Sequence, residues 1–119
     1  MTAPPTLLIV DDHAGFRTFA RALLEAAGFV VVGEAASGEA ALQAARELQP
    51  EVVLLDVVLP GLDGFAVCAE LAAENPAPAV VLTSSRDAST YRRRLQHSRA
   101  RGFISKGDLT GAAVAALVG

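Results

Sequence analysis

Acidic side chains follow two apolar runs of the sequence, at the point where each run ends. Asp11 and Asp12 come directly after Leu7–Val10. Asp56 comes directly after Val52–Leu55. If both runs are strands of one parallel sheet, the three carboxylates share an edge of that sheet. Two unit charges ~5 Å apart repel by about 3 kcal/mol at an effective dielectric constant of about 20, so a cation must join them or one must be protonated. Oxygen ligands without imidazole or thiolate select a hard ion, and a small incomplete cage suits Mg²⁺ (or Mn²⁺).

A hydroxyl and an ammonium end two further apolar runs. Thr83 follows Ala79–Leu82, and Lys106, the only lysine in a chain with nine arginines, follows Gly102–Ser105. The metal and ammonium charges would neutralise the oxygens of a phosphoryl group while the hydroxyl donates a hydrogen bond to it. A carboxylate can attack phosphorus and become an acyl phosphate, and Asp56 is best placed for that attack. The four strand ends together predict a site for phosphoryl transfer.

Simpler explanations exist for single residues of this set. An Asp at the end of a strand is often only the N-cap of the next helix, as Asp12 would be before a helix that begins at His13. Neither His13 nor His97 ends an apolar run, so we expect both to be solvated helix residues. The only cysteine, Cys68, lies in the apolar run Phe65–Leu71, where a buried, inert thiol is expected.

The elements that must position these residues alternate along the chain. Five apolar runs have strand length: Leu7–Val10, Val30–Glu34, Val52–Leu55, Ala79–Leu82 and Gly102–Ser105. Five stretches between and after them have helical spacing: His13–Ala27, Gly38–Leu48, Gly64–Glu74, Ala88–Ser98 and Leu109–Val118. Ser37 and Pro50 are the expected N-cap and stop of the second helix. The pattern predicts one α/β domain over residues 1–119, with a doubly wound parallel sheet of order 2-1-3-4-5.

The composition excludes several classes of protein. With 52% apolar and 19% charged residues, the chain is not disordered. No signal peptide is visible in the sequence, and no apolar run approaches the roughly 20 residues of a membrane helix, so we expect a soluble, cytoplasmic protein without a membrane partner. A net charge of −3 gives no global indication of nucleic-acid binding.

The ordered motifs resemble those of receiver domains of bacterial two-component response regulators, from Leu7 to about Leu117. The matching segments are Ile9–Asp12, Leu54–Gly64, Val81–Ser84 and Gly102–Lys106. The resemblance implies a flavodoxin-like fold, as in the single-domain chemotaxis regulators. It also implies that Asp56 accepts a phosphoryl group from the phosphohistidine of a sensor histidine kinase or phosphotransfer protein. Such a domain is a signalling switch, and the only reactions it catalyses are its own phosphorylation and dephosphorylation.

The resemblance also implies the ligands. Asp12, Asp56 and the main-chain carbonyl of Val58 would bind Mg²⁺, and Asp11 would do so through water.

The resemblance implies that the remaining matching residues either contact the phosphoryl group or move when it is bound. Lys106, Thr83 and the amides of Val58 and Ser84 would contact the phosphoryl group. Phe103 would turn inward when Thr83 is drawn to the phosphate. The altered surface would then be that of the fourth helix, fifth strand and fifth helix.

Two departures from the family pattern affect these expectations. Most members have proline after the lysine, often in a cis peptide, whereas this chain has Gly107. A cis bond before a residue other than proline costs about 3 kcal/mol, so both forms of the Lys106–Gly107 bond stay open. Val58 and Ser85 offer no carboxylate or amide to orient a hydrolytic water. We therefore expect self-dephosphorylation to take many minutes or longer.

The basic residues are concentrated in one part of the chain. Six of the ten lie between Arg86 and Arg101. The segment Arg92–Arg101 is either a solvated face or a docking surface for an acidic partner or a dimer mate. Nucleic-acid binding is disfavoured, because no interleaved aromatic residues or recognition-helix unit accompany the charges.

Three alternatives to a free-standing receiver remain. The chain could be the receiver half of a DNA-binding transcriptional regulator. It could instead be an Asp-nucleophile phosphatase of the haloacid dehalogenase type, although those enzymes have an Asp-x-Asp pair and a cap domain. A receiver that acts only by binding is the third, against which the intact acidic pair, Thr83 and Lys106 argue.

Overall fold

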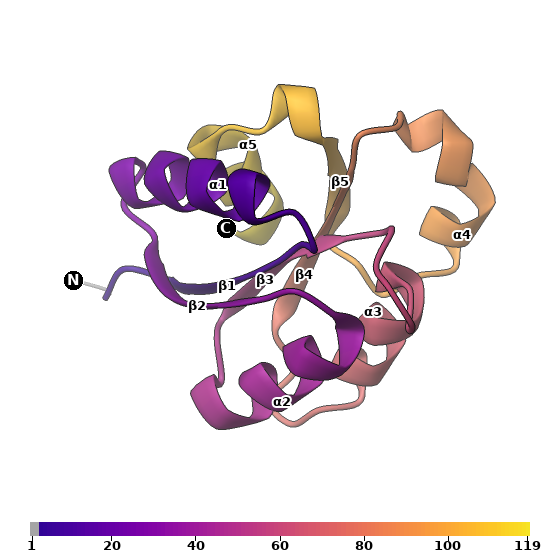
Figure 1. Cartoon of the computed structure of the whole chain (residues 1–119), viewed down its shortest axis with the longest axis horizontal. Helices are drawn as coiled ribbons and strands as arrows, with labels where there is room; N and C mark the ends of the chain where they lie inside the picture. The colour runs from indigo at the N-terminus through magenta and orange to yellow at the C-terminus, as the bar shows by residue number, and fades with distance from the viewer. Residues whose placement is uncertain (1–2) are drawn as a thin grey trace.

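A computed structural model describes residues 3–119 as a parallel five-stranded sheet with helices on both sides (Figure 1). The strands lie in the order β2-β1-β3-β4-β5, and every neighbouring pair is parallel. The predicted doubly wound topology is therefore confirmed, and each strand lies close to its expected range. The strands are β1 (Thr6–Val10), β2 (Val30–Ala35), β3 (Val52–Asp56), β4 (Ala79–Ser84) and β5 (Gly102–Ser105).

Both faces of the sheet are apolar and covered. Helices α1 (Ala14–Ala26) and α5 (Gly111–Val118) pack on the face that carries Leu7. Helices α2 (Gly38–Leu48) and α3 (Gly64–Ala72) pack on the face that carries Leu8, and Figure 1 shows the two pairs on opposite sides of the sheet. A fully buried leucine contributes about 1.5–3 kcal/mol, so this two-sided burial holds the central strands and the polar residues at their ends.

Side-chain caps set the starts of several helices. Ser37 Oγ accepts a hydrogen bond from the Ala40 amide at 3.2 Å, as expected for the N-cap of α2. Asp63 Oδ1 accepts one from the Ala66 amide at 2.9 Å and thereby caps α3. These caps satisfy amides that have no partner within the helix.

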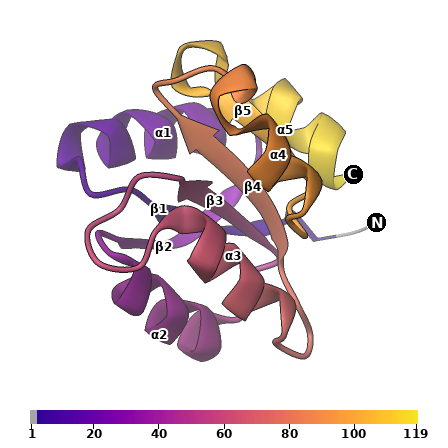
Figure 2. The same cartoon turned by 90° about the vertical axis from the view of Figure 1, so that its right-hand side faces the viewer.

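The expected helix over Ala88–Ser98 is wrong as a single element. The structure has a 3₁₀ helix, η1 (Ala88–Tyr91), followed by a short helix α4 (Arg92–Gln96). Tyr91, with φ −117° and ψ 16°, interrupts the helical backbone between them. Neither helix has a side-chain cap, and α4 has no fully buried residue, since Leu95 packs against the core but is only partly buried. Figure 2 shows α4 on the β4–β5 side of the molecule.

The segment after β5 also differs from its expected form. The chain first makes a 3₁₀ turn, η2 (Lys106–Asp108), and α5 begins at Gly111 rather than at Leu109. Leu109 is extended and buried, because its side chain joins the core beside α1. Within residues 3–119 the cis peptide is Asn75–Pro76, so the Lys106–Gly107 bond is trans. Over the same residues, no helix has the length and apolar character needed to cross a membrane.

Candidate functional site

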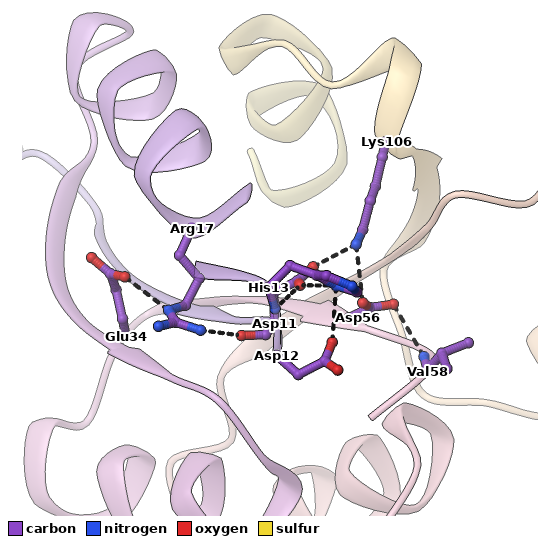
Figure 3. Close-up of polar contacts among 8 residues, drawn as sticks. All are labelled: Asp11, Asp12, His13, Arg17, Glu34, Asp56, Val58 and Lys106. Atoms are coloured by element: carbon purple, nitrogen blue, oxygen red, sulfur yellow. Dashed lines mark hydrogen bonds and ion pairs between the residues drawn. The ribbon is translucent and has the colours of Figure 1, made fainter. Parts of the chain in front are cut away.

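The carboxylates at the ends of β1 and β3 meet at one edge of the sheet (Figure 3). Asp11 is fully buried, Asp56 is 3% exposed, and the Asp12 side chain is 39% exposed. One ligand atom from each of these residues and from His13 lies within 4.8 Å of the others. Three of the residues predicted to bind a cation are thus brought together by the pairing of β1 with β3.

Lys106 reaches this cluster from the turn after β5. Its Nζ lies 2.7 Å from Asp11 Oδ2 and 3.1 Å from Asp56 Oδ2, so one ammonium bridges both buried carboxylates. The same Nζ lies 4.5 Å from the centroid of the Phe16 ring on α1, a cation–π contact that further fixes it. The side chain is 18% exposed, so water screens these charges only weakly.

Burial and charge make the two carboxyl groups unequal. Burial raises the pKa of Asp56 above its ordinary value, and the hydrogen bonds from Val58 and Lys106 oppose this only in part. Burial acts the same way on Asp11, but hydrogen bonds from Lys106 and the His13 amide hold the pKa of Asp11 below its ordinary value. Burial disfavours the ammonium, yet its bonds to both carboxylates raise the pKa of Lys106. Asp11 and Lys106 therefore form an ion pair in which both groups stay charged, and the neighbouring Asp56 carboxylate is more basic than that of Asp11.

The main chain and a hydroxyl complete the surroundings of Asp56. The Val58 amide donates to Asp56 Oδ1 at 3.1 Å, while the Val58 side chain is exposed. Thr83 lies directly opposite Asp56 in the β3–β4 register. Its Oγ1 is buried and has no hydrogen-bond partner among residues 3–119, an arrangement that costs about 1–3 kcal/mol.

The other predicted residues lie on the α3–α4 side of this edge. Ser84 is buried at the end of β4, and its Oγ is 3.0 Å from the hydroxyl of Tyr91. Phe103 on β5 is half-buried, and its ring centroid lies 5.9 Å from that of Tyr91. The structure therefore places Ser84 and Phe103 against one tyrosine that sequence analysis had assigned no role.

The contacts of Asp11 and Asp12 with His13 and Arg17 could not be read from the sequence. His13 is exposed, as expected, but its Nδ1 lies 3.3 Å from Asp11 Oδ1 and 3.1 Å from Asp12 Oδ1. The residue before α1 is His13, and the carboxylate that accepts its amide is that of Asp11, at 2.8 Å. Asp12 is therefore not the N-cap of this helix, which removes the simpler explanation for its place in the sequence. Arg17 donates to the Asp11 carbonyl at 2.8 Å and pairs with Glu34 at 3.0 Å, which ties β1, α1 and β2 together.

The donor set fits a hard divalent cation. Three of its four members are carboxylates, and the exposed imidazole of His13 is the fourth. The Asp12 carboxylate is half-exposed, and among residues 3–119 buried Asp11 Oδ2 has no hydrogen-bond partner and forms an ion pair with Lys106. Such an excess of negative charge with open positions suits an ion that keeps part of its water shell. The cluster therefore has the composition of a site that could hold a small divalent cation.

Comparison with known proteins gives concordant matches. A family model described as the response regulator receiver domain matches residues 7–114. The response regulator GacA of Pseudomonas viridiflava is 40% identical over 102 residues, which are 85% of this chain and 48% of that protein. The transcription regulator BvgA of Bordetella pertussis is 39% identical over 100 residues, 84% of this chain and 48% of that protein. This chain therefore spans about half the length of the curated relatives it matches. The signal receiver domain of NarL from Mycobacterium tuberculosis superposes with a TM-score of 0.83 at 32% identity, over 99% of each chain.

Proposed function

Because the chain belongs to the family of response regulator receiver domains, we propose that it is a phosphorylation switch with Asp56 as the phosphoryl acceptor. One observation carries the proposal. The Asp56 carboxylate is bonded at Oδ2 to the Lys106 ammonium and at Oδ1 to the Val58 amide, beside the second buried carboxylate of Asp11. A nucleophile held between donors that also suit phosphoryl oxygens needs little rearrangement to react.

The reaction we propose is an in-line transfer to Asp56. One carboxylate oxygen attacks the phosphorus of a phosphohistidine on a sensor histidine kinase or a phosphotransfer protein, the P–N bond breaks, and the imidazole leaves. The burial that raises the pKa of Asp56 also makes its carboxylate the better nucleophile of the pair. Lys106, already within 3.1 Å of Asp56, would neutralise the added oxygens.

The proposed cofactor is Mg²⁺ or Mn²⁺. Asp11, Asp12, Asp56 and the Val58 carbonyl would hold the ion, with His13 at the exposed rim of the cluster. When bound, it supplies positive charge to the phosphoryl oxygens in the transition state. Asp11 also keeps Lys106 in place, since the two form the shorter of the two ion pairs at 2.7 Å.

Thr83 is the proposed first element of the switch. Its buried hydroxyl has no hydrogen-bond partner within residues 3–119, and a phosphoryl group on the neighbouring Asp56 would supply one. The group adds a charge of about −1.5 to −2, and the Ser84 amide is a second proposed donor. Movement of Thr83 would leave room into which Phe103 turns, and the surface of α4, β5 and α5 would change with it.

The output partner is proposed to meet that surface. The basic segment Arg92–Arg101 lies on it, and an acidic partner or a second copy of the chain would complement its charge. We propose that the domain works in the cytoplasm and does not itself bind nucleic acid. A receiver that is one half of a DNA-binding regulator is the second candidate, because the matched relatives are about twice as long as the matched region.

A phosphodonor experiment separates these proposals from phosphatase activity. With acetyl phosphate and Mg²⁺, a receiver takes up one phosphoryl group per chain, whereas an Asp-nucleophile phosphatase releases phosphate continuously. Because the exposed side chains at Val58 and Ser85 offer no carboxylate or amide to orient a hydrolytic water, we predict that the isolated phosphoprotein decays over many minutes or longer. Steady release of phosphate, or decay within seconds, would refute the proposal that transfer is followed by slow hydrolysis.

A further inference from the structure

Tyr91 connects the proposed phosphate-binding turn to the helix that follows β4. Its hydroxyl and Ser84 Oγ are 3.0 Å apart, and Ser84 is buried directly after Thr83. Ser84 Oγ also accepts a hydrogen bond from the Arg86 amide at 3.1 Å. Ser84 Oγ therefore makes two hydrogen bonds: one to the Arg86 amide within the turn after β4, and one to the hydroxyl of Tyr91, the last residue of η1.

The ring of Tyr91 is held on two sides. Its centroid lies 5.9 Å from that of Phe65 on α3 and 5.9 Å from that of Phe103 on β5, with tilted rings in both pairs. Phe65 in turn lies under the Arg94 guanidinium, at 4.2 Å from its centroid, and Arg94 pairs with Asp63 at 2.7 Å. Tyr91 is thus fixed to α3 and β5 independently of its hydroxyl bond.

On the proposed function, the end of β4 must move relative to this fixed ring. Thr83 Oγ1 has no hydrogen-bond partner among the described residues, and on the proposed function it is drawn toward a phosphoryl group on Asp56, its register partner, so that Ser84, the next residue of β4, would shift with it. Phe103 takes part in the proposed switch, but the contact with Phe65 on α3 does not, and it holds the Tyr91 ring against such a shift, so the Ser84–Tyr91 bond is stretched or broken. The bond therefore belongs to the arrangement with a free Asp56 carboxylate.

We propose that Tyr91 is a positioning residue for the phosphorylation reaction: its hydroxyl restrains the Thr83–Ser84 turn and lowers the affinity of the site for a phosphoryl group. Tyr91 touches neither Asp56 nor Lys106 and acts only through Ser84. Deleting the hydroxyl removes one net hydrogen bond from the resting arrangement, which corresponds to a change of about fivefold in the equilibrium.

The test is a double-mutant cycle with beryllofluoride and Mg²⁺ as the probe of the phosphorylated arrangement. Tyr91→Phe keeps both ring contacts, and Ser84→Ala keeps the amide that would bind the phosphoryl group. Beryllofluoride dissociation constants are measured by calorimetry for the parent, both single variants and the double variant. We expect Tyr91→Phe to bind about fivefold more tightly than the parent, and to have no effect when Ser84 is already alanine. Equal affinity of the parent and Tyr91→Phe, weaker binding by Tyr91→Phe, or the same gain in the Ser84→Ala background would overturn the inference.

The sole tyrosine gives a second, spectroscopic readout. The chain has one tyrosine and no tryptophan, so its intrinsic fluorescence reports on Tyr91 alone. We expect beryllofluoride to change this fluorescence in the parent and much less in Ser84→Ala, where the bond is already absent. A purely structural role for Tyr91 would lower the stability of Tyr91→Phe to urea and leave the fluorescence response and the affinity ratio unchanged.

An Asp56→Ala control distinguishes a failure of the proposed function from a failure of the role proposed for Tyr91. If the parent fails to bind beryllofluoride, or if Asp56→Ala binds it equally well, the proposed function fails and the role of Tyr91 fails with it. If the parent binds and Asp56→Ala does not, while Tyr91→Phe matches the parent, only the role of Tyr91 is refuted.

Discussion

Replacing Lys106 by methionine tests how the two buried carboxylates are held together. Methionine keeps the length and apolar stem of the side chain but removes the charge that bridges Asp11 and Asp56. With ligand atoms within 4.8 Å of each other, two ionised carboxylates repel by about 3 kcal/mol at an effective dielectric constant of about 20, and in the variant the attraction to the ammonium no longer offsets this repulsion. The cation–π contact with Phe16 is lost as well, at about 0.5–1 kcal/mol. We predict that Lys106→Met lowers the free energy of unfolding by about 3 kcal/mol in the presence of EDTA.

Urea unfolding at neutral pH, followed by far-ultraviolet circular dichroism, measures this loss. Mg²⁺ should restore much of it, because the ion takes over the neutralisation of the carboxylates. A second substitution, Asp56→Asn in the Lys106→Met background, removes one of the repelling charges and should recover most of the stability without Mg²⁺. If Lys106→Met in EDTA is as stable as the parent, or if the second substitution recovers nothing, the electrostatic account of the cluster is wrong.

Three further predictions follow from single contacts. Thr83→Val removes a buried, unpaired hydroxyl and should raise the free energy of unfolding by about 1 kcal/mol while weakening beryllofluoride binding; a loss of stability would contradict this. At Gly64 an added Cβ would meet the Asp56 carbonyl oxygen and lie 2.7 Å from Val57 Cα, so Gly64→Ala should cost about 2–3 kcal/mol in urea unfolding. Its control Gly107→Ala meets nothing within 4 Å and should change stability by less than about 0.5 kcal/mol. Hydrogen bonds from the two arginines of α1 lower the pKa of Glu34. The ionised Glu34 side chain therefore adds about 1 kcal/mol to the free energy of unfolding at neutral pH, and this contribution is lost as pH falls below about 4. The difference in stability between the parent and Glu34→Gln should shrink accordingly in unfolding curves at low pH, and a difference that grows there would contradict it.

The sheet and the gathering of the carboxylates could be predicted from the sequence because both follow from short-range patterns. Continuous apolar runs such as Val52–Leu55 identify buried parallel strands, and the order of a doubly wound sheet brings their carboxyl ends to one edge. That rule places Asp11 and Asp56 near Lys106 without any knowledge of side-chain packing. The buried, unpaired state of the Thr83 hydroxyl, in contrast, depends on atoms of several elements.

What the sequence did not predict depends on contacts between distant side chains. The helix breaks at Tyr91, whose ring contacts those of Phe65 and Phe103, two residues that lie far from it in the sequence. Helical periodicity describes one element at a time, so it joined η1 and α4 into one helix. The contact of His13 with the carboxylates likewise depends on the direction in which the chain leaves β1.

The central claim is that Asp56 is the residue that accepts the phosphoryl group. The most direct measurement is mass spectrometry of the parent and of Asp56→Ala after incubation with acetyl phosphate and Mg²⁺. We predict that the parent gains the mass of one phosphoryl group, that hydroxylamine removes it as it does an acyl phosphate, and that the variant gains none. An equal gain by Asp56→Ala, or an adduct on the parent that hydroxylamine leaves intact, would contradict the account.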